Sequence, residues 1–149
     1  SNNKKAGGII FAKKNSIPVL IVNTDNRSYE NKIIQTLKKY KINLICLAGY
    51  MRIISKSFLQ KFRKKIINIH PSLLPKFKGL DTYSRIIKNK EIKTGCTVHF
   101  VNEKLDSGKI IIKKSFFIET NDNISLLKYK TQRLEKLAFP EALIRVFRN

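Results

Sequence analysis

The sequence has 149 residues, 42% of them apolar, so it is long enough for one domain with a hydrophobic core and too apolar for a disordered chain. Its apolar runs are far shorter than a membrane span and no secretory signal is visible, so we expect a cytoplasmic protein without a transmembrane helix. With 31 basic and 10 acidic residues, the net charge is +21. Cys46 and Cys96 lie in apolar runs without metal-site or redox spacing, so we expect buried thiols in a reducing compartment.

The positive charge is typical of a nucleic-acid-binding protein, but composition bias also explains it. Lysine (24 residues) far outnumbers arginine (7), and Lys, Ile and Asn together fill 59 of the 149 positions. The lysines are spread along the whole chain rather than gathered in one block. We therefore favour bias and expect no specific nucleic-acid partner, although the field would attract an anionic small substrate.

The first half of the chain alternates between helical and strand-like patterns. Apolar residues at helical spacing predict helices over 6–14, 29–40 and 55–62. Apolar runs of strand length predict strands over 18–22, 42–48 and 66–70. Because residues 42–48 (INLICLA) are continuously apolar, we expect that strand to be buried on both faces.

The second half predicts a short helix over 82–88, two strands over 95–102 and 109–118, and a long helix over 123–147 that Asn123 can cap. The tight link EKLDSG makes the last two strands antiparallel. Alternating strands and helices favour an α/β fold: a mainly parallel, Rossmann-like sheet with helices on both faces and an antiparallel C-terminal part.

Three polar residues lie where ligands bind in such folds. Asn68 and His70 are two positions apart at the end of a predicted strand, so their side chains point to the same side, and Asp106 lies in the EKLDSG loop. A carboxylate beside the imidazole would orient it and raise its pKa. Together the three could stabilise an oxyanion and move one proton, with the nucleophile supplied by the substrate. Each residue alone has a purely structural alternative: a strand-end cap, a backbone contact or a turn aspartate.

The flanking segments carry a resemblance that the individual residues do not. NIHPSLLPKFKGLDTY (68–83), LAGYMRIIS (47–55) and TGCTVHFVNEKLDSGKII (94–111) resemble, in order and separation, the signature segments of folate-dependent formyltransferases. The resemblance covers nearly the whole chain. It implies transfer of a formyl group from 10-formyltetrahydrofolate, as a co-substrate, to the amine of glycinamide ribonucleotide in purine biosynthesis. It implies no bound cofactor and no metal.

The resemblance also implies roles for individual residues. The catalytic residues would be Asn68, His70 and Asp106, with Asp106 raising the pKa of His70. The folate site would comprise Arg27, Met51, Arg52, Ile53, Ile54, Asn68, Asn102, Glu103, Lys104, Leu105 and Asp106. The ribonucleotide would contact Gln132 and Glu135, which share one helix face. Surface charge is the alternative for the arginines, core packing for Met51, Ile53 and Ile54, and a solvated helix face for Gln132 and Glu135. Thr97 and His99 are interpreted as pocket lining or core, with core favoured for His99.

The chain departs from the family pattern at its start. Family members begin with a strand, a glycine-rich phosphate loop and a second strand, whereas here SNN resembles the end of that second strand. We therefore expect residues 1–149 to be a single, N-terminally incomplete catalytic domain, monomeric or homodimeric, that binds folate better than the ribonucleotide. The alternatives are methionyl-tRNA formyltransferase, formyltetrahydrofolate deformylase and a basic nucleic-acid-binding module.

Overall fold

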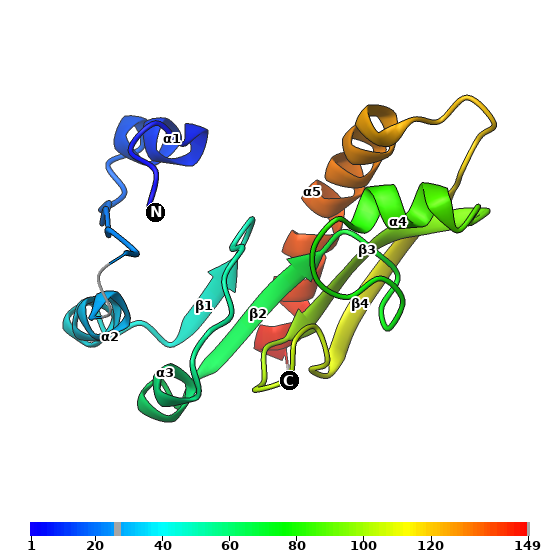
Figure 1. Cartoon of the computed structure of the whole chain (residues 1–149). Coiled ribbons are helices and arrows are strands. Elements are labelled where there is room, and N and C mark those ends of the chain that lie inside the picture. Colours follow the sequence, from blue (N-terminus) through cyan, green and yellow to red (C-terminus); the bar gives the residue numbers. More distant parts are fainter. Residues whose placement is uncertain (26–27, 149) are drawn as a thin grey trace.

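A computed structural model describes residues 1–25 and 28–148 (Figure 1). The elements in chain order are α1 (Gly7–Lys14), α2 (Tyr29–Lys39), β1 (Leu44–Leu47), α3 (Lys56–Lys61), β2 (Lys65–His70), α4 (Thr82–Lys88), β3 (Lys93–Phe100), β4 (Ile110–Phe117) and α5 (Ile124–Arg148). The strands form one sheet in the order β1-β2-β3-β4. β1 and β2 are parallel, whereas β3 is antiparallel to both β2 and β4. The α/β class and the antiparallel C-terminal part are confirmed, and among the described strands the sheet is mixed.

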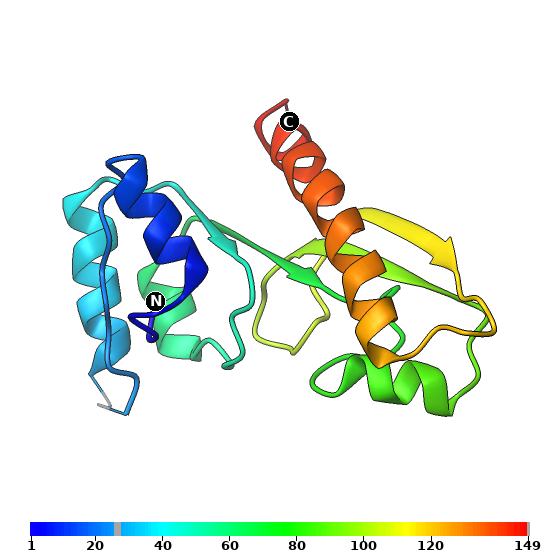
Figure 2. The same ribbon diagram turned by 90° about the horizontal axis from the view of Figure 1, so that it is seen from above.

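The two faces of β2 enter two different cores because successive strand residues point to opposite sides. Ile67 is fully buried with Cys96 and Val98 of β3 against α5, where Ala138 and Ala142 allow close approach. On the other side, Ile66 packs with Phe58 of α3 and Ile34 of α2. Helices therefore cover both faces, as expected. Figure 2 shows α1, α2 and α3 grouped beside β1, while α4 and α5 lie with β3 and β4.

The long helix α5 begins as the sequence predicts. The backbone N–H of Leu126 donates to Oδ1 of Asn123 at 2.9 Å, which satisfies one of the free amides of the first turn. The helix contacts β3 and β4 and also packs against α4. Within the described residues, neither this helix nor any other is long and apolar enough to cross a membrane.

One strand prediction is wrong, and another is wrong in part. Residues 18–22 lie in no strand, although Ser1 donates to the Leu20 carbonyl and accepts from the Val22 N–H, both at 2.9 Å. An apolar run becomes a strand only where a neighbouring backbone completes a ladder, and among the described residues Ser1 alone bonds to this run. β1 is not buried on both faces, because it lies at the edge of the sheet and Cys46 is exposed. Cys96 is buried as expected.

Candidate active site

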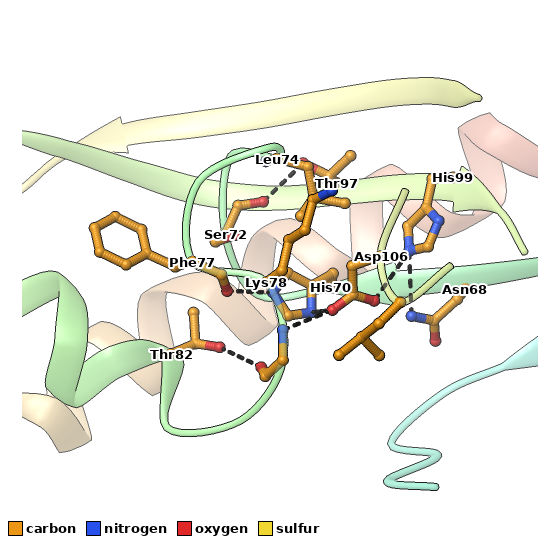
Figure 3. A network of polar contacts seen from close by, with 12 residues as sticks. Asn68, His70, Ser72, Leu74, Phe77, Lys78, Thr82, Thr97, His99 and Asp106 are labelled. Carbon is orange, nitrogen blue, oxygen red and sulfur yellow. Dashed lines mark hydrogen bonds and ion pairs between the residues drawn. The ribbon is translucent and has the colours of Figure 1, made fainter. Parts of the chain in front are cut away.

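The carboxyl end of β2 places two of the predicted residues on one face of the sheet. Asn68 and His70 lie opposite His99 and Thr97 of β3 in the antiparallel register. Directly opposed residues project to the same face, so these four polar side chains gather on one face of the sheet (Figure 3). Ile66 shares this face of β2 and packs with residues of α2 and α3. His70, Thr97 and His99 are all buried.

Asp106 reaches this cluster from the loop between β3 and β4 and lies between the two histidines. Its Oδ2 is 3.3 Å from Nδ1 of His70, and its Oδ1 is 3.6 Å from Nε2 of His99. The backbone N–H of Gly79 donates to Oδ2 at 2.8 Å. The expected convergence of His70 and Asp106 is therefore confirmed, and their side chains are only 7% and 8% exposed.

The hydrogen bonds of His70 identify the nitrogen that can exchange a proton. Nε2 lies 2.8 Å from the carbonyl oxygen of Phe77, which can only accept, so Nε2 carries a hydrogen. Nδ1 faces Asp106 instead. Because a backbone carbonyl does not take up protons, His70 gains and loses its second proton at Nδ1, beside the carboxylate.

Burial and charge act in opposite directions on this pair. Burial lowers the pKa of His70 below its ordinary value, against the raising effects of the Phe77 carbonyl and the Asp106 carboxylate. The carboxylate thus acts on the His70 pKa in the predicted direction, but burial outweighs it. For Asp106, burial would raise the pKa, yet the partners around its carboxylate, among them the Gly79 N–H and His70, lower it to about 2. Asp106 is therefore ionised at neutral pH.

His99 is a site residue that the sequence prediction assigned to the core. It is only 2% exposed, but its ring has polar partners on both sides. The carbonyl of Phe100 lies 2.8 Å from Nδ1, so Nδ1 carries a hydrogen and Nε2 accepts from the Asn68 amide at 3.3 Å. His99 thus orients Asn68. Alternation along 95–102 predicted that His99 lies on the same face as Thr97. The contact of His99 with Asn68 follows only from the register between β2 and β3, which the sequence does not specify.

Thr97 anchors the loop that follows His70. Its hydroxyl donates to the Ser72 carbonyl at 2.7 Å and accepts from the Leu74 N–H at 3.1 Å. The Ser72 hydroxyl donates to the Lys76 carbonyl at 2.6 Å and tightens the same loop. These buried bonds fix the path of the chain between β2 and α4.

The residues predicted to bind folate lie in two segments next to this cluster. Met51 and Ile53, on the segment after β1, are 71% and 70% exposed. Because β1 is parallel to β2, this segment begins at the edge of the sheet where β2 ends. Ile54 packs into the core beside Phe58, so its core alternative holds. Arg52 donates to the Thr24 carbonyl at 3.3 Å and lies 5.7 Å from the Tyr29 ring centroid. Arg27 lies outside the described residues.

The second predicted wall is the loop that carries Asp106. Glu103 approaches Lys56 of α3 at 3.8 Å, which places this loop next to the 51–56 segment. Asn102 accepts from the Lys104 N–H at 3.0 Å, and Leu105 is 52% exposed. The structure therefore places the two predicted folate segments next to each other.

Gln132 and Glu135 lie on α5, which covers the opposite face of the sheet. Gln132 is exposed, whereas Glu135 is half-buried and burial raises its pKa. The Glu135 carboxyl lies close enough to Tyr83 of α4 to help burial raise the pKa of that phenol to about 12. Within the described residues, no hydrogen bond or ion pair links Gln132 or Glu135 to Asn68, His70 or Asp106.

The cluster holds the elements of an acyl-group transfer. An imidazole that exchanges its proton at one defined nitrogen lies beside an ionised carboxylate, and His99 connects this pair to an amide donor, Asn68. No group of His, Cys, Asp or Glu in the described ranges could hold a metal ion.

Comparison with known proteins agrees with this chemistry. The family model described as formyl transferase matches residues 1–143. Phosphoribosylglycinamide formyltransferase of Haemophilus influenzae is 39% identical over 144 residues, covering 94% of this chain and 68% of that protein. The human trifunctional purine biosynthetic protein adenosine-3 is 37% identical over 149 residues, and the chain spans about 15% of its length.

Solved structures give the same result. The chain superposes on phosphoribosylglycinamide formyltransferase from Bacillus halodurans with a TM-score of 0.91 and 34% identity, covering 97% of this chain and 76% of that one. Glycinamide ribonucleotide transformylase 1 from Symbiobacterium toebii gives a TM-score of 0.92 with 33% identity, covering 99% of this chain and 71% of that one.

Proposed function

The chain belongs to the formyl transferase family, and we propose that it transfers the formyl group of 10-formyltetrahydrofolate to the amine of glycinamide ribonucleotide in purine biosynthesis. The observation that carries the proposal is the buried cluster at the end of β2, in which Asp106 contacts both His70 and His99. The family match over residues 1–143 supports one catalytic domain across the chain. A role in purine biosynthesis would place the protein in the cytoplasm.

Asn68 is the donor for the oxyanion of the transition state. When the substrate amine attacks the formyl carbon, a new C–N bond forms and the formyl oxygen gains negative charge. The amide nitrogen of Asn68 has two hydrogens, and one bonds to Nε2 of His99, which leaves the other for that oxygen. Because His99 fixes the amide in advance, little reorganisation is needed as the charge develops.

His70 and Asp106 transfer the proton that the attacking amine loses. The attacking amine must lose one proton, and the folate nitrogen must gain one as its bond to the formyl carbon breaks. The proton passes through Nδ1 of His70, and Asp106 stabilises the imidazolium while it exists. The Phe77 carbonyl keeps Nε2 protonated throughout. The sum of these steps consumes and releases no net proton at the enzyme.

The pterin of the folate would lie between the 51–54 segment and the 102–106 loop, which Lys56 and Glu103 bring together. Arg27 and Arg52 would contact the folate, and Gln132 and Glu135 would contact the ribonucleotide. Exposed apolar side chains at Met51, Ile53 and Leu105 suit a flat aromatic ligand. The positive charge of the chain would favour both anionic substrates.

An assay of the formyl acceptor tests this proposal. The native protein is mixed with 10-formyltetrahydrofolate and, separately, with glycinamide ribonucleotide, methionyl-tRNA or buffer alone, and the formylated product or free formate is measured. We expect rapid transfer to the ribonucleotide only. Faster transfer to methionyl-tRNA, or release of formate at the same rate without an acceptor, would replace the proposal with one of the two related activities.

A further inference from the structure

The segment 77–79 bonds to both members of the His70–Asp106 pair. The Phe77 carbonyl accepts the Nε2 hydrogen of His70 at 2.8 Å, and the Gly79 N–H donates to Asp106 at 2.8 Å. Figure 3 shows this loop passing alongside the two side chains. A displacement of the loop would therefore move the imidazole and the carboxylate at the same time.

The loop needs support because part of its backbone is in an unfavourable conformation. Phe77 has φ 56°, in the left-handed region that non-glycine residues avoid, and Gly79 has φ 79°. Such conformations persist only where surrounding contacts hold them. Two hydrogen bonds connect the loop to its surroundings: Lys78 donates to the Ser107 hydroxyl, and the Thr82 hydroxyl donates to the Gly79 carbonyl.

Arg85 of α4 also contacts the loop and stabilises it. Its Nη2 donates to the Lys78 carbonyl at 2.5 Å, and its Cζ lies 5.8 Å from the centroid of the Phe77 ring, within cation–π range. Its Nε is buried and has no hydrogen-bond partner among the described residues, so the guanidinium is placed here at a desolvation cost. The guanidinium of Arg85 thus contacts two consecutive residues of the loop, the Phe77 ring and the Lys78 carbonyl.

We propose that Arg85 is a positioning residue for the His70–Asp106 pair, acting through the Phe77–Gly79 loop that bonds to both. This inference rests on the proposed function only for its effect on catalysis. Arg85 touches neither member of the pair through a hydrogen bond or ion pair in the described structure. It bonds to the Lys78 carbonyl and packs against the Phe77 ring, and the Phe77 carbonyl accepts from Nε2 of His70. The other ionisable groups that act on His70 are Asp106 and His99.

Two substitutions separate the geometry of Arg85 from its charge. Arg85→Lys keeps the positive charge but loses the planar fork, and Arg85→Gln loses both. Arg145→Gln is the matched control, because Arg145 also donates to a main-chain carbonyl, that of Ile111, on the far part of α5. Thermal melts of all three variants establish that each is folded.

The spectroscopic readout uses the fact that the chain contains only two histidines. His70 has Nε2–H bonded to Phe77 and His99 has Nδ1–H bonded to Phe100, so each should give a ring N–H signal protected from exchange with water. We expect both Arg85 variants to lose or broaden the His70 signal and to keep that of His99. Arg145→Gln should keep both signals.

The kinetic readout is kcat for formyl transfer, which should fall about 10- to 100-fold in both Arg85 variants, since a misplacement of about 1 Å can cost ~10²-fold. An unchanged His70 signal in both Arg85 variants, or wild-type kcat in Arg85→Lys, would overturn the inference. If the wild-type protein transfers no formyl group, the proposed function fails, and the His70 signal alone still decides the role of Arg85.

Discussion

Nδ1 of His70 lies 3.3 Å from Oδ2 of Asp106, and both side chains are more than nine-tenths buried. At this distance and depth, the charge of one group strongly affects the protonation of the other. Because Nε2 of His70 is bonded to the Phe77 carbonyl, the effect concentrates on a single nitrogen. The two groups therefore titrate as one coupled pair.

Replacing Asp106 with asparagine keeps the shape of the side chain and removes the charge that favours protonated His70. We expect Asp106→Asn to lower the pKa of His70 further below its ordinary value, because the carboxylate acts to raise it. Formyl transfer should fall by at least about 10²-fold, the lower range for loss of a positioned acid–base group. The measurements are an NMR titration of His70 and the rate of formyl transfer.

Glu119→Gln is the control for this substitution, because Glu119 contacts Lys130 and lies outside the cluster. It should change neither the His70 titration nor the rate. Near-normal transfer by Asp106→Asn, or a higher pKa of His70 in that variant, would remove Asp106 from the proton-transfer role.

Acid should destabilise the fold through the same carboxylate. The pKa of Asp106 falls from 3.8 to about 2 on folding, so the ionised group stabilises the folded state above pH ~4. This stabilisation, roughly 2–3 kcal/mol, is lost as the pH falls towards 2. His70 acts in the same direction, because its lowered pKa makes protonation below pH ~6.5 unfavourable in the folded state.

Urea unfolding of His70→Gln and of the double variant His70→Gln/Asp106→Asn at pH 6 and pH 3 checks this, because His70 no longer titrates in either protein. The free energy of unfolding of the single variant should fall more between these pH values than that of the double variant. Equal losses in the two proteins would show that the Asp106 carboxyl titrates alike in the folded and unfolded states.

The sequence predicted most of the elements because their periodicity is local. The helix over 82–88 and the two strands around the EKLDSG loop follow from spacing and turn residues alone. The prediction of a strand over 18–22 was wrong because strand formation depends on a partner backbone that no local pattern specifies. The prediction that Cys46 is buried was wrong for a similar reason, since an edge strand and a central strand can have the same apolar run.

The site followed a similar division. Spacing predicted that Asn68 and His70 share a face, the EKLDSG loop offered Asp106 as the third candidate, and the resemblance implied the role of each. The role of His99 depends on a contact with Asn68, 31 positions away in the chain, and that of Arg85 on a bond to the Lys78 carbonyl across a loop. From the local pattern alone, a histidine in an alternating strand is equally consistent with a place in the core, and an arginine on a short helix is consistent with an exposed surface charge.

His99 should matter for catalysis through Asn68. His99→Phe removes the acceptor for the Asn68 amide, so the oxyanion donor loses its fixed orientation. We expect a fall in kcat smaller than the ~10²–10³-fold cost of removing a donor outright. His99→Gln, which retains an acceptor oxygen, should recover part of the loss. Equal kcat in His99→Phe and the wild type would show that Asn68 needs no orientation by His99.

The positive charge should not give strong binding to nucleic acid. The 31 basic residues are spread along the chain, so we expect weak binding to random DNA or RNA at physiological salt, within or above the non-specific Kd range of ~10⁻⁴–10⁻⁶ M. Fluorescence anisotropy with a labelled oligonucleotide measures this Kd. Submicromolar affinity would instead support a nucleic-acid partner.

The transfer of an isotope-labelled formyl group tests the central claim most directly. Native protein is mixed with labelled 10-formyltetrahydrofolate and glycinamide ribonucleotide in a single turnover, alongside Asn68→Ala and Arg145→Gln. We predict that the label reaches the ribonucleotide amine in the wild type and in Arg145→Gln, and that Asn68→Ala is slower by ~10²–10³-fold, the cost of one oxyanion donor. A label that never reaches the ribonucleotide in the wild type, or that reaches it equally fast in Asn68→Ala, would contradict formyl transfer at this site.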